Sequence, residues 1–272
     1  MLGPRTLVMG VINVTPDSFS DGGTALDAAA ALDIAQAMEA AGADIIDIGA
    51  ESTRPNAKAV PADEELARAL PVLRALASRV KTPLSIDTYK AAVAAVALDE
   101  GAVIVNDVSG FTFDAALAPL VAARGVPAVL MHTRGRPDDM YAQAEYLDVV
   151  GEVALELERC VHRAQDHGVL RRQMIVDPGL GFAKRAPQSM AALAGLERLS
   201  SELGLPILVG PSRKSFLAAA TGPLQPEDRD WATAAAVTAA VLGGAHIVRV
   251  HAVDRMIHVV RVADAVRHAA GA

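Results

Sequence analysis

The sequence is poor in aromatic residues, in cysteine and in long apolar runs, and it has no excess of positive charge. Only 3% of its 272 residues are aromatic, and its formal net charge is −7. The scarcity of aromatic side chains argues against a nucleic-acid platform that works by stacking bases. The negative charge provides no general field that would attract nucleic acid or anionic membranes. An anionic substrate must therefore be bound by a local cluster of cations.

The single cysteine, Cys160, excludes an internal disulfide and a cysteine-based metal cluster, and it fits a reducing compartment. Residues 1–6 contain no apolar run of the signal-peptide type. The longest apolar stretches are shorter than a membrane span, and no group of histidines has the spacing of metal ligands. We therefore expect a cytoplasmic protein that binds neither membranes nor nucleic acid.

The chain is instead rich in aliphatic side chains, with 52% hydrophobic and 21% charged residues, which excludes an intrinsically disordered protein. These side chains form eight short apolar runs that do not alternate with polar residues. Such runs are typical of strands that are covered on both faces. The predicted strands are Leu7–Asn13, Asp44–Gly49, Pro83–Asp87, Val103–Asp107, Val126–Met131, Gln173–Asp177, Pro206–Gly210 and His246–Val250.

Segments rich in Ala and Leu, with helical spacing, lie between the predicted strands. The clearest of them are Ala25–Ala41, Ala62–Ser78, Lys90–Glu100 and Tyr141–His167. Eight strand–helix units without a break in composition predict an α/β fold, a (β/α)8 TIM barrel that forms a single domain over residues 1–272. The alternative is an open, doubly wound sheet, but no glycine-rich dinucleotide turn follows the first strand.

Nearly every predicted strand ends in a polar or ionisable side chain, and catalytic groups of such barrels lie at the carboxyl ends of the strands. Asp87, Asn106 and Asp177 close three different strands. Each alone could be an ordinary turn former or helix cap. Together they favour a pocket for a flat heterocycle with a guanidine-like edge, because a carboxylate can accept two parallel N–H bonds.

Arg249 and His251 stand two residues apart at the end of the last strand, a spacing that places both side chains on the same face. Asn13 ends the first strand, which is the neighbour of the last one in a closed barrel. We interpret the three as a cradle for an oxyanion or a phosphate. The alternative is a surface arginine and an ordinary core histidine.

The segment Gly210-Pro-Ser-Arg-Lys-Ser215 follows the seventh strand and is expected to open a helix, whose N-terminus would bind an anion. Lys214 and Ser215 add a cation and a hydroxyl group. A Schiff-base lysine is the alternative. Because Lys214 lies four residues beyond Gly210, we favour an electrostatic or stacking role.

Two polar loops carry one apolar side chain each. Residues 13–23 include Phe19, and residues 51–56 include Pro55. This composition suits lids that close on a substrate, with ordinary surface loops as the alternative.

Eight motifs identify a resemblance to the dihydropteroate synthase family over essentially the whole chain. They are Asn13–Gly23, Glu51–Pro55, Ser85–Thr88, Asn106–Gly110, Met131-His132, Asp177–Phe182, Ser212–Phe216 and Arg249–His251. The resemblance implies that 6-hydroxymethyl-7,8-dihydropterin pyrophosphate is joined to 4-aminobenzoate in folate biosynthesis, with Mg²⁺ assisting. Dihydropteroate and pyrophosphate would be the products, and the carbon–oxygen bond would break before the amine attacks. The resemblance also implies inhibition by sulfonamides and a homodimer, and the Ala- and Val-rich segment Trp231–Leu242 permits an apolar interface.

The resemblance also assigns roles to single residues. For the pterin it implies Asp87, Asn106, Met131, Asp177 and Lys214. For the pyrophosphate it implies Asn13, Thr53, Arg54, Arg249 and His251, with Asn13 as the Mg²⁺ ligand. For 4-aminobenzoate it implies Phe19, Thr53, Arg54, Pro55, Phe182, Lys214 and Ser215. The implied catalytic residues are Asp87, Asp177, Lys214, Arg249 and His251, together with Asp17 and Asp21 of the first loop.

Three positions depart from the family pattern. Asn56 and Ala183 stand where the family commonly has glycine, and Thr133 stands where methionine is frequent. Two other functions stay open at this point, a methyltetrahydrofolate-binding methyl-transfer domain with the same barrel and a non-catalytic pterin-binding paralogue. The Ser-Arg-Lys-Ser and Arg-Val-His motifs count against the methyl-transfer domain, which needs no pyrophosphate and aminobenzoate site. A non-catalytic paralogue would be expected to lose loop or cation residues, and all of them are present.

Overall fold

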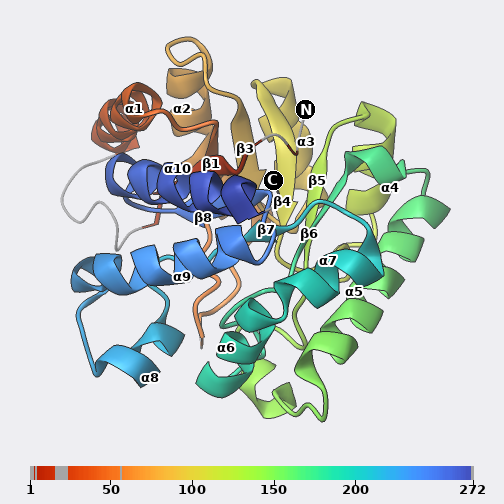
Figure 1. The fold of residues 1–272 in the computed structure, drawn as a ribbon. Coiled ribbons are helices and arrows are strands. Elements are labelled where there is room, and N and C mark those ends of the chain that lie inside the picture. Colours follow the sequence, from red (N-terminus) through yellow and green to blue (C-terminus); the bar gives the residue numbers. More distant parts are fainter. Residues whose placement is uncertain (1–2, 4, 16–23, 56, 271–272) are drawn as a thin grey trace.

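A computed structural model of the chain describes residues 3, 5–15, 24–55 and 57–270. In these residues eight parallel strands form one sheet (Figure 1). The strands are β1 (Leu7–Asn13), β2 (Ile45–Gly49), β3 (Leu84–Asp87), β4 (Ala102–Asp107), β5 (Ala128–Met131), β6 (Met174–Asp177), β7 (Leu208–Val209) and β8 (Ile247–Val250). Their order is β6-β5-β4-β3-β2-β1-β8-β7, and a single bridge between Val176 and Ile207 joins β6 to β7. The sheet closes on itself, so the predicted TIM barrel is confirmed and the doubly wound alternative is wrong.

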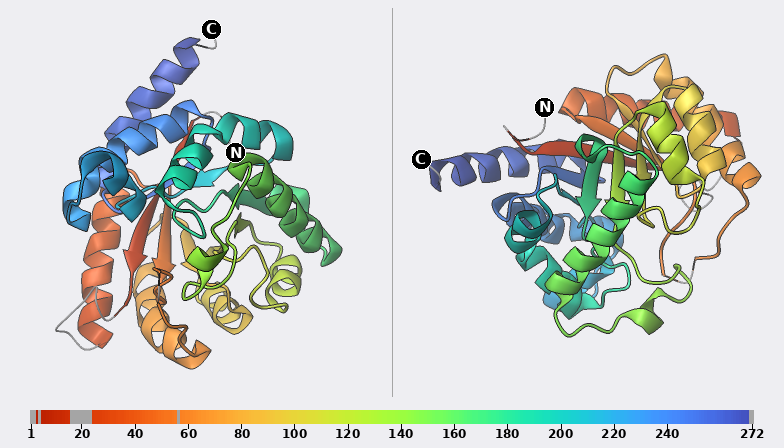
Figure 2. Two further views of the ribbon diagram at one scale, coloured as in Figure 1. Left: turned by 90° about the horizontal axis from the view of Figure 1, so that it is seen from below. Right: turned by 90° about the vertical axis from the view of Figure 1, so that its right-hand side faces the viewer.

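The helices follow the strands along the chain and surround them, as the two views of Figure 2 show. They are α1 (Thr24–Ala41), α2 (Ala62–Ala77), α3 (Ala91–Asp99), α4 (Leu117–Arg124), α5 (Val149–Asp166), α6 (Ala186–Ala194), α7 (Leu196–Leu203), α8 (Ala218–Thr221), α9 (Asp230–Leu242) and α10 (Val253–Ala270). Among the described residues, none of these helices combines the length and the apolar character that a membrane span requires.

Two predicted elements differ from the structure. The helix predicted over Tyr141–His167 begins only at Val149, because Asp148 accepts a hydrogen bond from the backbone N–H of Gly151 (3.2 Å) and caps the helix there. Residues Met140–Gln143 form a separate 3-10 turn. The segment after β7 does not open a long helix either. It forms one 3-10 turn over Ser215–Leu217 and then α8, which has four residues.

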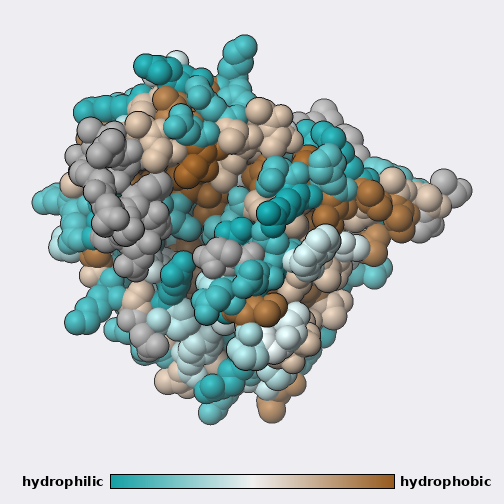
Figure 3. All heavy atoms as spheres, turned by 90° about the vertical axis from the view of Figure 1, so that its left-hand side faces the viewer, coloured by the Kyte–Doolittle hydropathy of each residue, from teal (hydrophilic) through white to brown (hydrophobic). Residues whose placement is uncertain are grey.

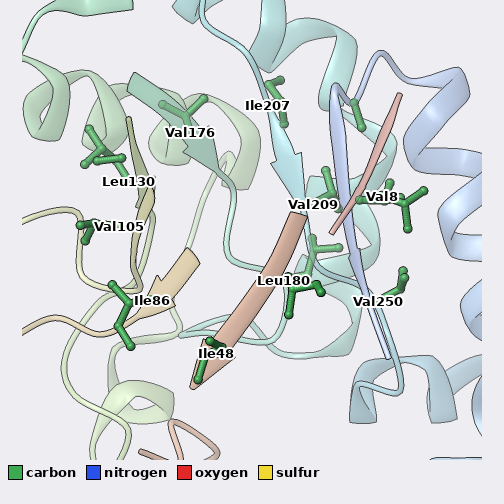
Figure 4. Close-up of a cluster of buried hydrophobic side chains, with 14 of the residues drawn as sticks. Val8, Ile48, Ile86, Val105, Leu130, Val176, Leu180, Ile207, Val209 and Val250 are labelled. Atoms are coloured by element: carbon green, nitrogen blue, oxygen red, sulfur yellow. The ribbon is translucent and has the colours of Figure 1, made fainter. Parts of the chain in front are cut away.

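The two faces of the strands contribute to two separate apolar clusters of the core. Outward-facing residues such as Val8, Ile48 and Leu130 belong to the larger cluster, which packs against the helices (Figure 4). Inward-facing residues form a separate apolar cluster inside the barrel, and its members are Met9, Ile45, Ile104, Val129, Ile175, Leu208 and Ile247.

A polar layer follows this inner cluster toward the carboxyl ends of the strands. Side chains that are two residues apart on a strand point to the same face, and two residues after an inner apolar residue the chain repeatedly has a polar one. The pairs are Ile45 and Asp47, Ile104 and Asn106, Ile175 and Asp177, and Ile247 and Arg249. The same alternation that buries the barrel floor therefore places a ring of polar groups above it.

Candidate active site

Arg249 lies at the centre of the polar layer. Its Nε donates to Asp47 Oδ2 (2.7 Å), and its Nη2 donates to Asp87 Oδ2 (2.7 Å). Asn106 Nδ2 donates to the same oxygen of Asp47 (2.8 Å). Side chains from β2, β3, β4 and β8 thus meet in one hydrogen-bonded cluster. Asp87, Asn106 and Arg249 were predicted at this mouth, and the structure brings them together.

Asp47 is the member of this cluster that the sequence analysis missed. It is fully buried, and its Oδ1 has no hydrogen-bond partner among the described residues. A buried acceptor without a partner is costly, so this oxygen is suited to accept an N–H group of a bound ligand. The available signal was a carboxylate inside the apolar run Ile-Ile-Asp-Ile, two residues after the inward-facing Ile45.

The two carboxylates of the cluster share one guanidinium group. Burial raises the pKa of Asp87 above its usual range; Arg249 opposes this shift, and the carboxylate of Asp47 adds to it. A site with this excess of acceptors is matched by a neutral ligand that presents several N–H donors, as the guanidine-like edge of a heterocycle does.

Asp177 and Lys214 form the second charged group at the mouth. Asp177 ends β6, and its Oδ1 accepts from the backbone N–H of Gly179 (2.7 Å). The ammonium group of Lys214 donates to the carbonyl oxygen of Leu180 (2.6 Å) and lies 4.7 Å from the centre of the Phe182 ring. Burial raises the pKa of Asp177 and lowers that of Lys214 to about 8, and each charge opposes the shift of the other. Lys214 therefore has the ring contact that a stacking role requires.

His251 lies one residue beyond the end of β8, next to Ser212. Its Nδ1 is 2.9 Å from Ser212 Oγ, and its backbone N–H donates to the same oxygen (3.2 Å). Burial and, to a smaller extent, the positive charges of Arg249, Arg213 and Arg54 lower the pKa of His251 to about 4. The ring is therefore neutral in a region that several guanidinium groups make positive. An anion bound there would be stabilised by these charges.

The segment that carries Lys214 is held by α9. Arg213 donates to both carboxylate oxygens of Asp230 (2.8 and 3.0 Å), and its backbone N–H donates to Thr233 Oγ1 (3.0 Å). The φ angle of Arg213 is +58°, in the left-handed region that side chains rarely adopt. The turn that follows spans only Ser215–Leu217, so the expected helix is replaced by a short turn, and the anion site at this segment stays a prediction.

The remaining predicted residues that the structure describes are Asn13, Thr53, Arg54, Pro55, Met131 and Ser215. Asn13 is the last residue of β1 and pairs with Gly49 of β2. Thr53 is partly buried, Arg54, Pro55 and Ser215 are exposed, and Met131 is buried at the end of β5 in a cluster that includes Phe182. Asp17, Phe19, Asp21 and Asn56 lie outside the described residues.

The other departures from the family pattern have different settings. Ala183 is fully buried with a φ of +47°, a conformation that favours glycine, the residue that the resemblance implies at this position. Thr133 is partly buried and follows His132. In the described part of the chain, no three His, Cys, Asp or Glu side chains gather to hold a metal ion.

The model of the family described as pterin binding enzyme matches residues 9–251. A dihydropteroate synthase of Synechocystis is 46% identical over 263 residues, which cover 97% of this chain and 91% of that protein. The chain belongs to the dihydropteroate synthase family. Another dihydropteroate synthase, from Clostridium beijerinckii, is 41% identical and covered to 90%. In contrast, the chain covers 36% of the folic acid synthesis protein fol1 of Schizosaccharomyces pombe, to which it is 46% identical.

Solved structures of the family agree with the fold throughout. The dihydropteroate synthase of Clostridium difficile, crystallised in the presence of pteroic acid, has a TM-score of 0.91 and is 38% identical, with 97% of this chain and 98% of that chain covered. The Xanthomonas albilineans dihydropteroate synthase with 4-aminobenzoic acid has a TM-score of 0.90 and is 42% identical, with 97% and 93% covered.

Proposed function

We propose that this chain condenses 6-hydroxymethyl-7,8-dihydropterin pyrophosphate with 4-aminobenzoate to give 7,8-dihydropteroate and pyrophosphate. The observation that carries the proposal is the arrangement at the barrel mouth, where carboxylate and amide groups of Asp47, Asp87, Asn106 and Asp177 lie together with the cations Arg249 and Lys214. Acceptors suit the pterin, and cations suit the pyrophosphate. The similarity to dihydropteroate synthases over 97% of the chain supports the same reaction.

The pterin would bind in the acidic part of the mouth. Asp87 and Asp177 would accept hydrogen bonds from its N–H groups, and Asn106 would both accept and donate. Met131 would pack against its apolar face. Lys214, next to Asp177, would balance the charge of that carboxylate. Such a pocket orients the methylene carbon of the substrate toward the loops.

The pyrophosphate would lie beside the cations of the mouth, and the contacts that we assign to it are Asn13, Thr53, Arg54, Arg249 and His251. Positive groups placed where the leaving group gains charge lower the barrier to its departure. The single amide oxygen of Asn13 fits Mg²⁺ that is held mainly by phosphate oxygens and water, and the ion would neutralise part of the pyrophosphate charge.

The aminobenzoate would bind between the loops, where we assign contacts to Phe19, Thr53, Arg54, Pro55, Phe182, Lys214 and Ser215. In the proposed reaction the bond between the methylene carbon and the pyrophosphate oxygen breaks, and the pyrophosphate keeps the electron pair. The amine nitrogen then bonds to the methylene carbon and loses a proton. Closure of the loops, including the segment with Asp17 and Asp21, would keep water from the carbocation that forms at the methylene carbon when the pyrophosphate leaves.

The test is dihydropteroate formation by the purified protein from the two substrates, with and without Mg²⁺. We expect turnover that requires both substrates and falls when Mg²⁺ is removed, and we expect sulfonamides to compete with 4-aminobenzoate. Binding of the pterin without any coupling would contradict the proposal and favour a non-catalytic paralogue. Binding of methyltetrahydrofolate in place of both substrates would favour a methyl-transfer domain.

We also propose that two copies of the chain form a homodimer through α9 and α10. The exposed large apolar residues there are Trp231, Leu242, Val262 and Val266, and apolar side chains are visible along the projecting C-terminal end of α10 (Figure 3). Such side chains are common in homodimer interfaces. The molar mass in solution should be twice that of the chain and should fall to one chain in Val262→Glu. An unchanged mass would contradict this interface.

A further inference from the structure

A buried lysine that has no part in the proposed substrate contacts lies behind Asp177 and Lys214. Lys184 is 1% exposed, and its ammonium nitrogen lies 2.7 Å from His132 Nδ1. It also donates to the carbonyl oxygens of Gly179 (3.3 Å) and Phe182 (3.1 Å). Burial lowers the pKa of Lys184 to about 7, and the negative charge of Asp177 opposes this shift. In its ammonium form the group has three protons to donate, and three acceptors surround it.

The loop over residues 178–184 is wound around this ammonium group. Gly179, Gly181 and Ala183 have φ angles of +66°, +80° and +47°, so the backbone turns sharply at alternate positions. The same short loop supplies both contacts of the Lys214 ammonium group, the carbonyl oxygen of Leu180 and the ring of Phe182. Whatever fixes this loop also fixes Lys214.

His132 connects Lys184 to helix α5. Its Nε2 lies 3.0 Å from Glu156 Oε2, and Arg134 donates from Nε to both oxygens of that carboxylate (3.1 Å each). Because an ionised carboxylate only accepts hydrogen bonds, Nε2 carries the proton and Nδ1 is left as an acceptor for Lys184. Burial and the nearby Lys184 lower the pKa of His132 to about 4, so the ring stays neutral.

We propose that Lys184 is a positioning residue of the aminobenzoate site, and that Glu156 and His132 orient its hydrogen bonds. Lys184 holds the loop in the shape that presents Phe182 and the Leu180 carbonyl group to Lys214. The proposal rests on the proposed function, which assigns Lys214 to both substrates and Phe182 to 4-aminobenzoate alone, so the selectivity for 4-aminobenzoate comes from Phe182. It predicts that loss of the buried contacts weakens this substrate more than the pterin.

The first experiment compares steady-state kinetics of Lys184→Met with two control variants. Methionine keeps an unbranched chain of similar length but donates no hydrogen bond. We expect the KM for 4-aminobenzoate to rise about tenfold or more, and the KM for the pterin substrate to change less than about threefold. Lys81→Met changes an exposed lysine, and Val161→Ala opens a small cavity on the same helix as Glu156. Both controls should leave the two KM values unchanged. Equal rises for both substrates in Lys184→Met, or an effect matched by Val161→Ala, would overturn the proposal.

The second experiment separates the hydrogen bond from the bulk of the ring at position 132. In His132→Asn the amide oxygen can take the place of Nδ1 as an acceptor, whereas His132→Leu offers none. We expect the KM for 4-aminobenzoate to stay within about threefold of the wild-type value in the first variant and to rise about tenfold in the second. Identical behaviour of the two variants would overturn the proposal.

A spectroscopic measurement tests the wild-type protein without relying on turnover. In nitrogen-15 NMR spectra of the histidine rings, His132 should show the tautomer with the proton on Nε2 near neutral pH. The tautomer with the proton on Nδ1 would overturn the proposal even in an active enzyme. A wild-type protein that shows the expected tautomer but forms no dihydropteroate would instead refute the proposed function alone.

Discussion

Gly179 is the position at which one added methyl group should do the most damage to the site. A β-carbon there would overlap the carbonyl oxygen of His132 and would lie 3.3 Å from Met131 Cγ. Gly125, at the end of α4, has nearly the same φ angle (+67° against +66°), but nothing lies within 4 Å of its added β-carbon. The two glycines therefore share the conformational penalty of an alanine substitution, and only Gly179 adds a steric one.

The magnitudes follow from these two terms. A left-handed alanine costs about 1–2 kcal/mol, offset by about 0.4–1 kcal/mol from the lower entropy of the unfolded chain, so Gly125→Ala should destabilise by about 1 kcal/mol. Overpacking at Gly179 adds about 1–3 kcal/mol. With a shift of about 2–4 °C for each kcal/mol, the Tm should fall by about 3 °C in Gly125→Ala and by roughly 5–15 °C in Gly179→Ala.

The assay is thermal unfolding of both variants, followed by circular dichroism and combined with turnover measured well below the transition. Gly125→Ala should keep wild-type turnover. Gly179→Ala should lose most of it, because the loop that contacts Lys214 must move away from His132. If the two variants have the same Tm and the same turnover, the reasoning about the clash is refuted.

Lys214→Ala and Asp177→Asn should each abolish most dihydropteroate formation while the protein stays folded, and near-normal turnover in either variant would refute the assigned contacts. Asp47→Asn should shift the acid limb of the pH profile of kcat/KM toward lower pH, because the Asp47 carboxylate raises the pKa of Asp87. An acid limb at the same pH as in the wild type would count against this coupling. His132 and His251 have pKa values of about 4, whereas an ordinary histidine has a pKa of 6.5. Between these pH values the two rings are protonated in the unfolded chain and stay neutral in the folded chain. Stability should therefore fall as the pH drops from about 6.5 to about 4, by roughly 2 kcal/mol per histidine at about pH 5. Urea unfolding should show a smaller acid loss in His132→Asn than in the wild type, and equal losses would contradict this origin.

The barrel could be predicted from the sequence because its signals are local. Each strand is a short apolar run, and the polar residue that ends it stands within the same few positions, as at Asp87 and Asp177. The alternation along a strand then determines which side chains reach the mouth. For the same reason Arg249 and Asn106 could be expected at the mouth, although the sequence analysis grouped Arg249 with Asn13 and His251, and the structure bonds it to Asp47 and Asp87.

The contacts that the sequence did not predict join residues that are far apart along the chain. Lys184 and His132 are 52 positions apart, and the separation of Asp47 and Arg249 is 202 positions. A buried carboxylate or lysine is tolerated only with such partners, and no periodic pattern names them. The short turn after β7 was missed because α9, through Asp230, holds that segment instead of a helix of its own.

The substrate and catalytic roles of the individual site residues, the use of Mg²⁺, the homodimer and the cytoplasmic location stay predictions. Asp17, Phe19 and Asp21 belong to a segment outside the described residues.

The join between β6 and β7 has a consequence for the whole barrel. Strand β7 has two residues, and one bridge, between Val176 and Ile207, connects it to β6. The loops that leave these two strands supply Phe182 and Lys214, and the bond from Lys214 to the carbonyl oxygen of Leu180 crosses the same join. A substrate held by both loops would join β6 to β7 at the point where the two strands have only one bridge, and it would do so only while it is bound. Hydrogen exchange along β6 and β7 should then slow on binding, and part of the stiffness of the working enzyme would be supplied by what it binds.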